Sequence, residues 1–368
     1  GLTPTVARQF AELLLSMAFA LVLVDVLRDY RDLRQIALII MVAGSMAALI
    51  GIVLWLMPDS LAESILRRLA IIGYPDSNII QYTEQNPDLP ERAIGTAANP
   101  NSLGGFLVMV AALVAPQMMA EHPLTGRRWH GFAMTAVLVG CLVLTFSRGS
   151  MLAFGAALVF IAALRYRRLL LILAVIALLI LALPWTQFYV ARLIEGFQGA
   201  DLATQMRFGE YRDALTLIGR YPLFGVGFSG TPDIDIYLGV ANVYLTIASN
   251  MGLLGLGAFL VLMAAIFIYG WRALRHVSFA TEMHPLLIGL LAGLVGALAN
   301  GIFDHYFFNL GFHPAITLLW TFIGVALAAS RVTLAEAEAQ EPRRPLAPTQ
   351  RAAKQKNPRG SLAPGSRM

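Results

Sequence analysis

Apolar runs alternate with short polar segments over most of this 368-residue chain. Many of these runs are about 20 residues long, which is the length that a helix needs to cross the hydrocarbon core of a bilayer. We therefore expect about nine membrane spans. They lie at residues 10–27, 36–57, 101–120, 131–146, 150–164, 169–184, 241–270, 285–303 and 313–329. The strict alternation of a membrane β-barrel is absent, so the predicted fold class is all-α, a polytopic helical membrane protein.

Two longer polar segments interrupt this pattern. Residues 58–98 carry six acidic side chains and only three arginines, which favours the outer side of the membrane. Residues 185–240 form the second segment, a large loop that is expected on the extracytoplasmic side. Within it, residues 204–219 are expected to form an amphipathic helix. Short loops rich in arginine follow alternate spans and are expected in the cytoplasm. With a cytoplasmic C-terminus this count leaves Gly1 outside, so we expect an odd number of further spans to precede it.

Composition supports the membrane assignment. The chain is 58% hydrophobic and 13% charged, whereas soluble domains are roughly 25% charged. The net charge of +5 does not indicate nucleic-acid binding, because the basic residues gather in loops and in the tail. Residues 331–368 are rich in Pro, Ala, Arg and Lys and are expected to be a disordered cytoplasmic tail after a transmembrane domain at residues 1–330. The single cysteine, Cys141, excludes an internal disulfide pair.

Arginines outside the cytoplasmic clusters are the sharpest chemical signal. Arg148 lies at the tip of a hairpin between two apolar runs, where it needs an anionic partner or reaches the interface as an anchor. Arg207, Arg212 and Arg220 lie in the second polar segment, and their guanidinium groups suit the oxygens of a phosphate. Pairing with nearby acidic residues of a solvated helix explains Arg212 and Arg220 at least as well.

Other candidates are weaker. Asp304 and His305 follow an expected helix, either as an acid–base pair or as a helix end at the interface. The segment Pro222-Leu-Phe-Gly225-Val-Gly227 could bring flexible backbone close to a ligand, but a lone Gly-x-Gly is not specific. No spacing of His, Asp and Glu indicates a metal site, and no nucleotide-binding pattern occurs, so we expect neither metal nor cofactor.

Several motifs in order resemble those of the O-antigen ligase and O-antigen polymerase family of bacterial membrane glycosyltransferases. They are Gly95-Thr-Ala-Ala-Asn99-Pro-Asn101, Thr145-Phe-Ser147-Arg148-Gly149, Arg207-x-x-x-Tyr211-Arg212-x-Ala214, Pro222-Leu-Phe-Gly-Val-Gly227, Asn242-x-Tyr244-Leu and Gly252-Leu-Leu-Gly255. The resemblance reaches to about residue 329.

This resemblance implies a fold of the lipid-dependent glycosyltransferase type, with about twelve spans in a complete member, in the bacterial inner membrane. It implies transfer of a glycan from an undecaprenyl-pyrophosphate carrier to an acceptor on the outer face. Arg148 and Arg207 would neutralise the leaving group, and Asp304 and His305 are further catalytic candidates. The substrate-binding candidates are Asn99, Asn101, Arg212, Arg220, Asn242 and Tyr244. The expected partners are therefore this lipid-linked oligosaccharide and the membrane.

One position departs from the family pattern. Ligases of the family commonly carry a histidine before the Asn-x-x-Leu motif, where this chain has Ala241, and the later acidic position is Asn250. Asp304, His305, Asp233 and Asp235 are possible replacements for the missing base. A member without transferase activity, such as a bicarbonate transporter or a scaffold, is the alternative. The near absence of charge inside the expected spans favours the enzyme over the transporter.

Overall fold

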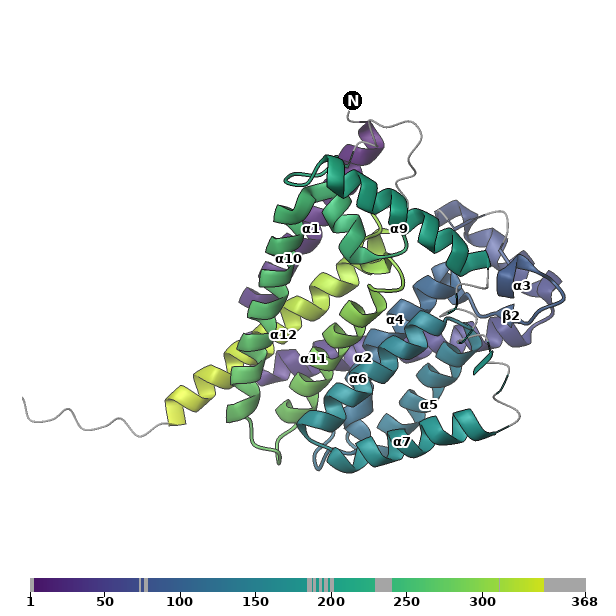
Figure 1. Cartoon of the computed structure of the whole chain (residues 1–368). Helices are drawn as coiled ribbons and strands as arrows, with labels where there is room; N and C mark the ends of the chain where they lie inside the picture. Colours follow the sequence, from purple (N-terminus) through teal and green to yellow (C-terminus); the bar gives the residue numbers. More distant parts are fainter. Residues whose placement is uncertain are drawn as a thin grey trace, which may run out of the picture.

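The computed structural model describes residues 3–72, 74–75, 79–183, 202–228, 240–310 and 312–340, with single positions between 187 and 198. Within these residues nine helices correspond to the nine expected spans (Figure 1). They are α1 (Pro4–Val26), α2 (Tyr30–Leu56), α4 (Pro100–Val114), α5 (Arg128–Leu144), α6 (Arg148–Leu164), α7 (Arg167–Ala182), α10 (Val243–His276), α11 (Met283–Asn300) and α12 (His313–Gln340).

Shorter elements join these helices. They are α3 (Asp59–Arg67), η1 (Arg68–Ile72), β1 (Gln81–Tyr82), η2 (Thr83–Gln85), β2 (Glu91–Arg92), η3 (Gly95–Ala97), η4 (Ala115–Met118), α9 (Leu202–Arg220) and η6 (Tyr306–Phe308). The two strands pair antiparallel, with Tyr82 opposite Glu91. Figure 1 shows α9, the helix expected at residues 204–219, lying across one end of the bundle.

Among the described residues, six helices are long and apolar enough to cross a membrane: α1, α2, α4 with its extension η4, α10, α11 and α12. The chain is therefore an all-α, multi-pass membrane protein. The other three expected spans are shorter, with 17 residues in α5, 17 in α6 and 16 in α7. At 1.5 Å per residue they reach about 25 Å, less than the roughly 30 Å of the hydrocarbon core.

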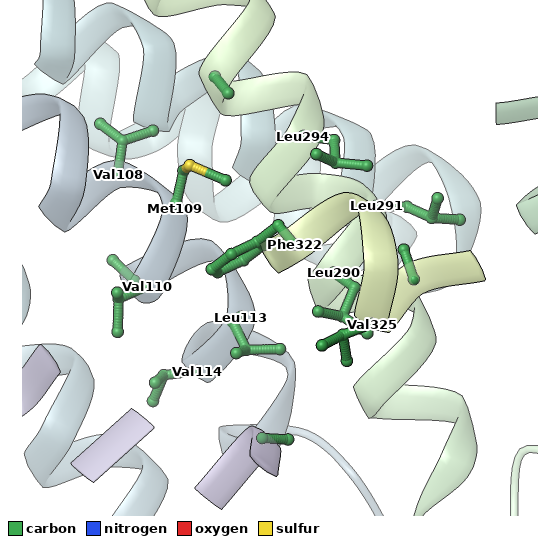
Figure 2. Close-up of a cluster of buried hydrophobic side chains, with 14 of the residues drawn as sticks. Val108, Met109, Val110, Leu113, Val114, Leu290, Leu291, Leu294, Phe322 and Val325 are labelled. Atoms are coloured by element: carbon green, nitrogen blue, oxygen red, sulfur yellow. The ribbon is translucent and has the colours of Figure 1, made fainter. Parts of the chain in front are cut away.

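Helices α4 and α11 form the centre of the bundle. Their spanning windows are 78% and 83% buried, against 17% for α10, whose apolar side chains face outward as lipid-facing side chains would. Figure 2 shows Phe322 of α12 between Met109 of α4 and Leu290 of α11. Gly289 of α11 permits close contact with the backbone of α4, because a Cβ atom at this position would lie 2.7 Å from the carbonyl oxygen of Leu113. Small residues bring the two helix backbones together, as they commonly do in membranes.

Helix α10 is broken at Gly252, which has φ 70° and ψ −178°. The segment after α9 fills the break. The Val226 N–H donates to the Ser249 carbonyl (2.8 Å), and the Leu253 N–H donates to the Pro222 carbonyl (2.8 Å). These bonds satisfy backbone groups that the break leaves without helical partners. This segment, which could bring flexible backbone close to a ligand, joins α9 to α10, and its residues do not line the cleft described below.

The last helix is longer than expected. α12 continues to Gln340, so residues 331–340 are helical and do not belong to the expected disordered tail. This part of the helix is rich in Ala and Glu, which have high helix propensity. It also packs at its start, where Val332 and Thr333 are buried. The rest of the expected tail, Asp233 and Asp235 all lie outside the described residues.

Candidate functional site

A cleft of about 790 Å³ lies where four distant segments of the chain meet. The residues around it that carry chemistry come from the loop between α3 and α4, the α5–α6 turn, the first half of α9 and the turn after α11. They include Glu84, Arg92, Asn99, Asn101, Ser147, Arg148, Arg207, Asn300 and Asp304. Three arginines in one cleft, with the two carboxyl groups of Glu84 and Asp304, suit an anionic ligand with a hydroxyl group beside it.

Arg148 begins α6, directly after the turn that ends α5. Phe146 adopts φ 51°, an uncommon value for a residue with a side chain. The Thr145 hydroxyl supports the turn by donating to the Leu142 carbonyl (2.6 Å) and accepting from the Ser147 N–H (3.2 Å). The half-buried Arg148 side chain lines the cleft. This is the hairpin-tip position that the sequence predicts for it.

Arg207 lines the same cleft from α9. Neighbouring side chains fix this helix to the bundle: the Tyr211 hydroxyl donates to the carbonyls of Ala241 (3.4 Å) and Ile302 (3.3 Å), and Glu210 accepts from the Ala241 N–H (3.0 Å). Burial raises the pKa of Tyr211, while nearby Arg207 opposes that rise. Ala241, which stands where related ligases have a histidine, therefore contributes its backbone to holding α9.

Arg212 and Arg220 are exposed and are not among the described residues that line the cleft. Five residues of helix turn Arg212 about 140° away from Arg207. Arg220 lies 13 residues further along the helix, which is about 20 Å. Substrate binding by Arg212 and Arg220 therefore stays a prediction, beside the alternative of a solvated helix.

Asp304 and His305 follow α11 on a turn that Asn300 starts, because the Asp304 N–H donates to the Asn300 carbonyl (3.0 Å). Asp304 lines the cleft with 18% of its side chain exposed. Its Oδ1 atom lies 3.8 Å from Nδ1 of His305, which is not a lining residue. That Nδ1 is buried without a hydrogen-bond partner among the described residues. Asp304 is therefore the member of the pair that can reach a ligand in the cleft.

Asn99 and Asn101, which are predicted to bind substrate, both line the cleft. The Asn99 side chain caps α4 by accepting from the N–H groups of Asn101 (2.8 Å) and Ser102 (3.3 Å). Pro100 takes the first helical position, where its missing N–H costs nothing. The sequence Asn-Pro-Asn is thus the helix start that its pattern indicates, and it brings the positive end of α4 to the cleft.

Asn242 and Tyr244 do not line the cleft in the described part of the chain, and their role in substrate binding stays a prediction. Asn242 caps α10 by accepting from the Leu245 N–H (2.9 Å), and its amide donates to the Ile302 carbonyl (2.9 Å). The Tyr244 hydroxyl donates to the Leu298 carbonyl (2.7 Å). These polar groups join the start of α10 to the end of α11.

Arg92 and Asn300 line the cleft although sequence reasoning did not select them. In the sequence, Arg92 is one of three arginines in an acidic loop, and no nearby motif indicates that it belongs to a site. Asn300 carried a usable signal, because an amide inside an apolar run is expensive in a membrane and is often functional. The described residues contain no group of three His, Cys, Asp or Glu side chains placed to share a metal ion.

Part of this cleft belongs to a segment that matches a known sequence family. Residues 132–260 match the family described as O-antigen ligase. The chain carries an O-antigen ligase family domain. The match covers the α5–α6 hairpin, α9 and the first part of α10, and so includes Arg148 and Arg207. A search of curated protein sequences found no match to the chain. Other cleft residues, among them Arg92, Asn99, Asn101, Asn300 and Asp304, come from outside the matched segment.

Proposed function

We propose that this protein transfers a glycan from undecaprenyl pyrophosphate to an acceptor hydroxyl on the outer face of the bacterial inner membrane. One observation carries the proposal: Arg148 and Arg207, selected separately as phosphate-binding candidates, line one cleft. The O-antigen ligase match over residues 132–260 supports this class of reaction.

The cleft has the electrostatics that a diphosphate needs. Arg92, Arg148 and Arg207 offer forked donors for phosphate oxygens. Helices α4 and α6 begin at the cleft, and the positive ends of helices attract anions. Negative charge develops on the departing diphosphate during transfer, so donors fixed around it lower the energy of the transition state.

Asp304 is the base that we assign to the reaction. The oxygen of the acceptor hydroxyl attacks the anomeric carbon of the donor sugar, and its proton passes to the Asp304 carboxylate. The bond between the anomeric carbon and the phosphate oxygen breaks, and its electron pair leaves with undecaprenyl pyrophosphate. His305, 3.8 Å behind Asp304, positions the carboxylate. This assignment supplies a base in a chain that has Ala241 at the usual histidine position.

Binding of undecaprenyl pyrophosphate to the purified full chain tests the proposal. Arg148→Ala and Arg207→Ala should each weaken binding, and each should slow glycan transfer about 100-fold or more. Arg212→Ala is the matched control, because Arg212 lies on the same helix as Arg207 but is exposed outside the cleft. Equal binding by all four folded proteins, or no binding by the wild type, would overturn the proposal.

A further inference from the structure

Asn300 ends α11 and is almost fully buried, with 1% of its surface exposed. Its side-chain oxygen accepts a hydrogen bond from the Ser150 hydroxyl (3.1 Å). The Ser147 hydroxyl lies 3.0 Å from that of Ser150. Because Ser150 gives its proton to Asn300, Ser147 is the donor to Ser150 in this arrangement. The two hydroxyls thus link the start of α6 to the Asn300 side chain.

The other half of the amide is unpaired. Nδ2 of Asn300 is buried and has no hydrogen-bond partner among the described residues. Buried donors in folded proteins are nearly always paired, because burial without a partner is unfavourable. Asn300 is also a lining residue of the cleft. A ligand in the cleft is therefore the natural source of the missing acceptor.

The first turn of α6 lies at the same wall of the cleft. Ser147, Arg148 and Gly149 all line it. Ser147 occupies the capping position of α6, but its side chain makes no capping hydrogen bond and bonds to Ser150 instead. Gly149 must lack a side chain, because a Cβ atom there would lie 2.5 Å from Cβ of Phe303. The helix start is thus left open at the cleft.

We propose that Asn300 Nδ2 and the first turn of α6 form a subsite for a diphosphate oxygen of the glycan donor. The groups that Asn300 and the start of α6 contribute here are donors or cations: the Asn300 amide, the open positive end of α6 and Arg148. That combination selects an anionic oxygen over a sugar hydroxyl. The subsite rests on the proposed function, whose arginines it extends with a residue from α11.

The test measures binding of three probes to the full chain: undecaprenyl pyrophosphate, inorganic pyrophosphate and the free glycan without diphosphate. Asn300→Leu keeps the size of the side chain and removes the donor. It should weaken binding of both diphosphate probes by about 10- to 100-fold, as expected for a lost hydrogen bond to a charged group. Binding of the free glycan should not change.

Two further variants separate this role from a structural one. Ser150→Ala keeps Nδ2 and removes only the hydroxyl that holds the amide, so it should weaken diphosphate binding less than Asn300→Leu. Gln117→Met is the matched control, because Gln117 is another fully buried amide with an unpaired Nε2 and does not line the cleft. It should bind the probes as the wild type does. Thermal unfolding confirms that each variant is folded, and Asn300→Asp replaces Asn300→Leu if the latter is not.

The outcomes distinguish the subsite from the proposed function. If wild-type binding depends on Arg148 but is the same in the Asn300 variant, the subsite is overturned and the function stands. A loss in Ser150→Ala as large as in Asn300→Leu makes Asn300 a structural link between α6 and α11 and also overturns the subsite. If Asn300→Leu weakens binding of the free glycan but not of the diphosphate probes, Asn300 contacts the sugar, and the diphosphate subsite is overturned. If the wild type binds none of the probes, both proposals fall.

Discussion

Arg92 donates a hydrogen bond of 2.8 Å from Nη2 to the side-chain oxygen of Asn101. Its Nε donates to the carbonyl of Thr145, also at 2.8 Å. One side chain thus joins the loop before α4, the first turn of α4 and the α5–α6 turn that presents Arg148. Arg92 shapes the cleft and adds positive charge to it.

Arg92→Ala should therefore reduce both activity and stability. Removal of the charged donor leaves two acceptors at the cleft wall without their partner, which costs about 1–3 kcal/mol of stability. Glycan transfer should fall at least about 10-fold, because the cleft also loses a cation. Arg92→Lys keeps the positive charge and should recover part of the activity, but it should not restore both hydrogen bonds of the guanidinium group. Transfer rates and thermal unfolding of both variants provide the measurement.

Arg67→Ala is the control for this experiment. Arg67 is exposed on α3, pairs with Glu63 at 2.7 Å and does not line the cleft. Its loss should change stability by less than about 1 kcal/mol and leave transfer unchanged. An Arg92→Ala protein as active and as stable as Arg67→Ala would contradict the role given to Arg92.

The break in α10 gives a second prediction, which concerns stability alone. Gly252 has φ 70°, and a Cβ atom there would lie 2.1 Å from the Leu223 carbonyl oxygen. Gly252→Ala should destabilise the protein by at least about 2 kcal/mol, because it adds both backbone strain and a clash with the inserted segment. Gly257→Ala is the matched control on the same helix, where a Cβ atom would meet nothing within 4 Å. Thermal unfolding in detergent should show a lower unfolding temperature for Gly252→Ala than for Gly257→Ala. Equal unfolding temperatures would contradict the structural role given to Gly252.

Much of the fold could be predicted from the sequence, since apolar runs and arginine clusters are local properties. Arg148 and Arg207 could also be selected, because charge at an expected outer surface is conspicuous in so apolar a chain. The sequence could not show which of the other arginines nearby also belong to the cleft. Arg212 has the same chemistry as Arg207, and only the helical rotation between them separates a cleft residue from a solvated one.

Other parts of the candidate site depend on contacts between distant segments. Asn242 and Tyr244 belong to motifs, yet their polar groups bind backbone carbonyls at the end of α11. Arg92 reaches the cleft through Asn101 and Thr145, and the Thr145 contact crosses 53 residues of sequence. No local pattern predicts such contacts, because a polar side chain that stabilises a turn and one that binds substrate look the same in sequence.

The third prediction concerns Glu91, which lies on β2 beside Arg92. Burial, and then the nearby charge of Asp59, raise the pKa of the Glu91 carboxyl from 4.5 to about 7. The folded protein therefore binds more protons at this group than the unfolded chain between these two values. Stability from this group is fully present below about pH 4.5 and is lost as the pH rises through about 7. Glu91→Gln removes the titrating group and should remove this part of the pH dependence.

Thermal unfolding of the wild type and Glu91→Gln between about pH 4.5 and 8.5 tests this sign. As the pH rises, the unfolding temperature of the variant should increase relative to that of the wild type by about 1–2 °C. The effect is small because solvent screens a partly exposed group. Asp59→Asn is a second arm. It removes the charge that adds to the effect of burial on the pKa of Glu91, so the loss of stability should be smaller and should end at a lower pH. A difference in unfolding temperature that is constant over the whole range, or one that favours the variant more toward acid pH, would show that the pKa of Glu91 is not raised in the folded protein.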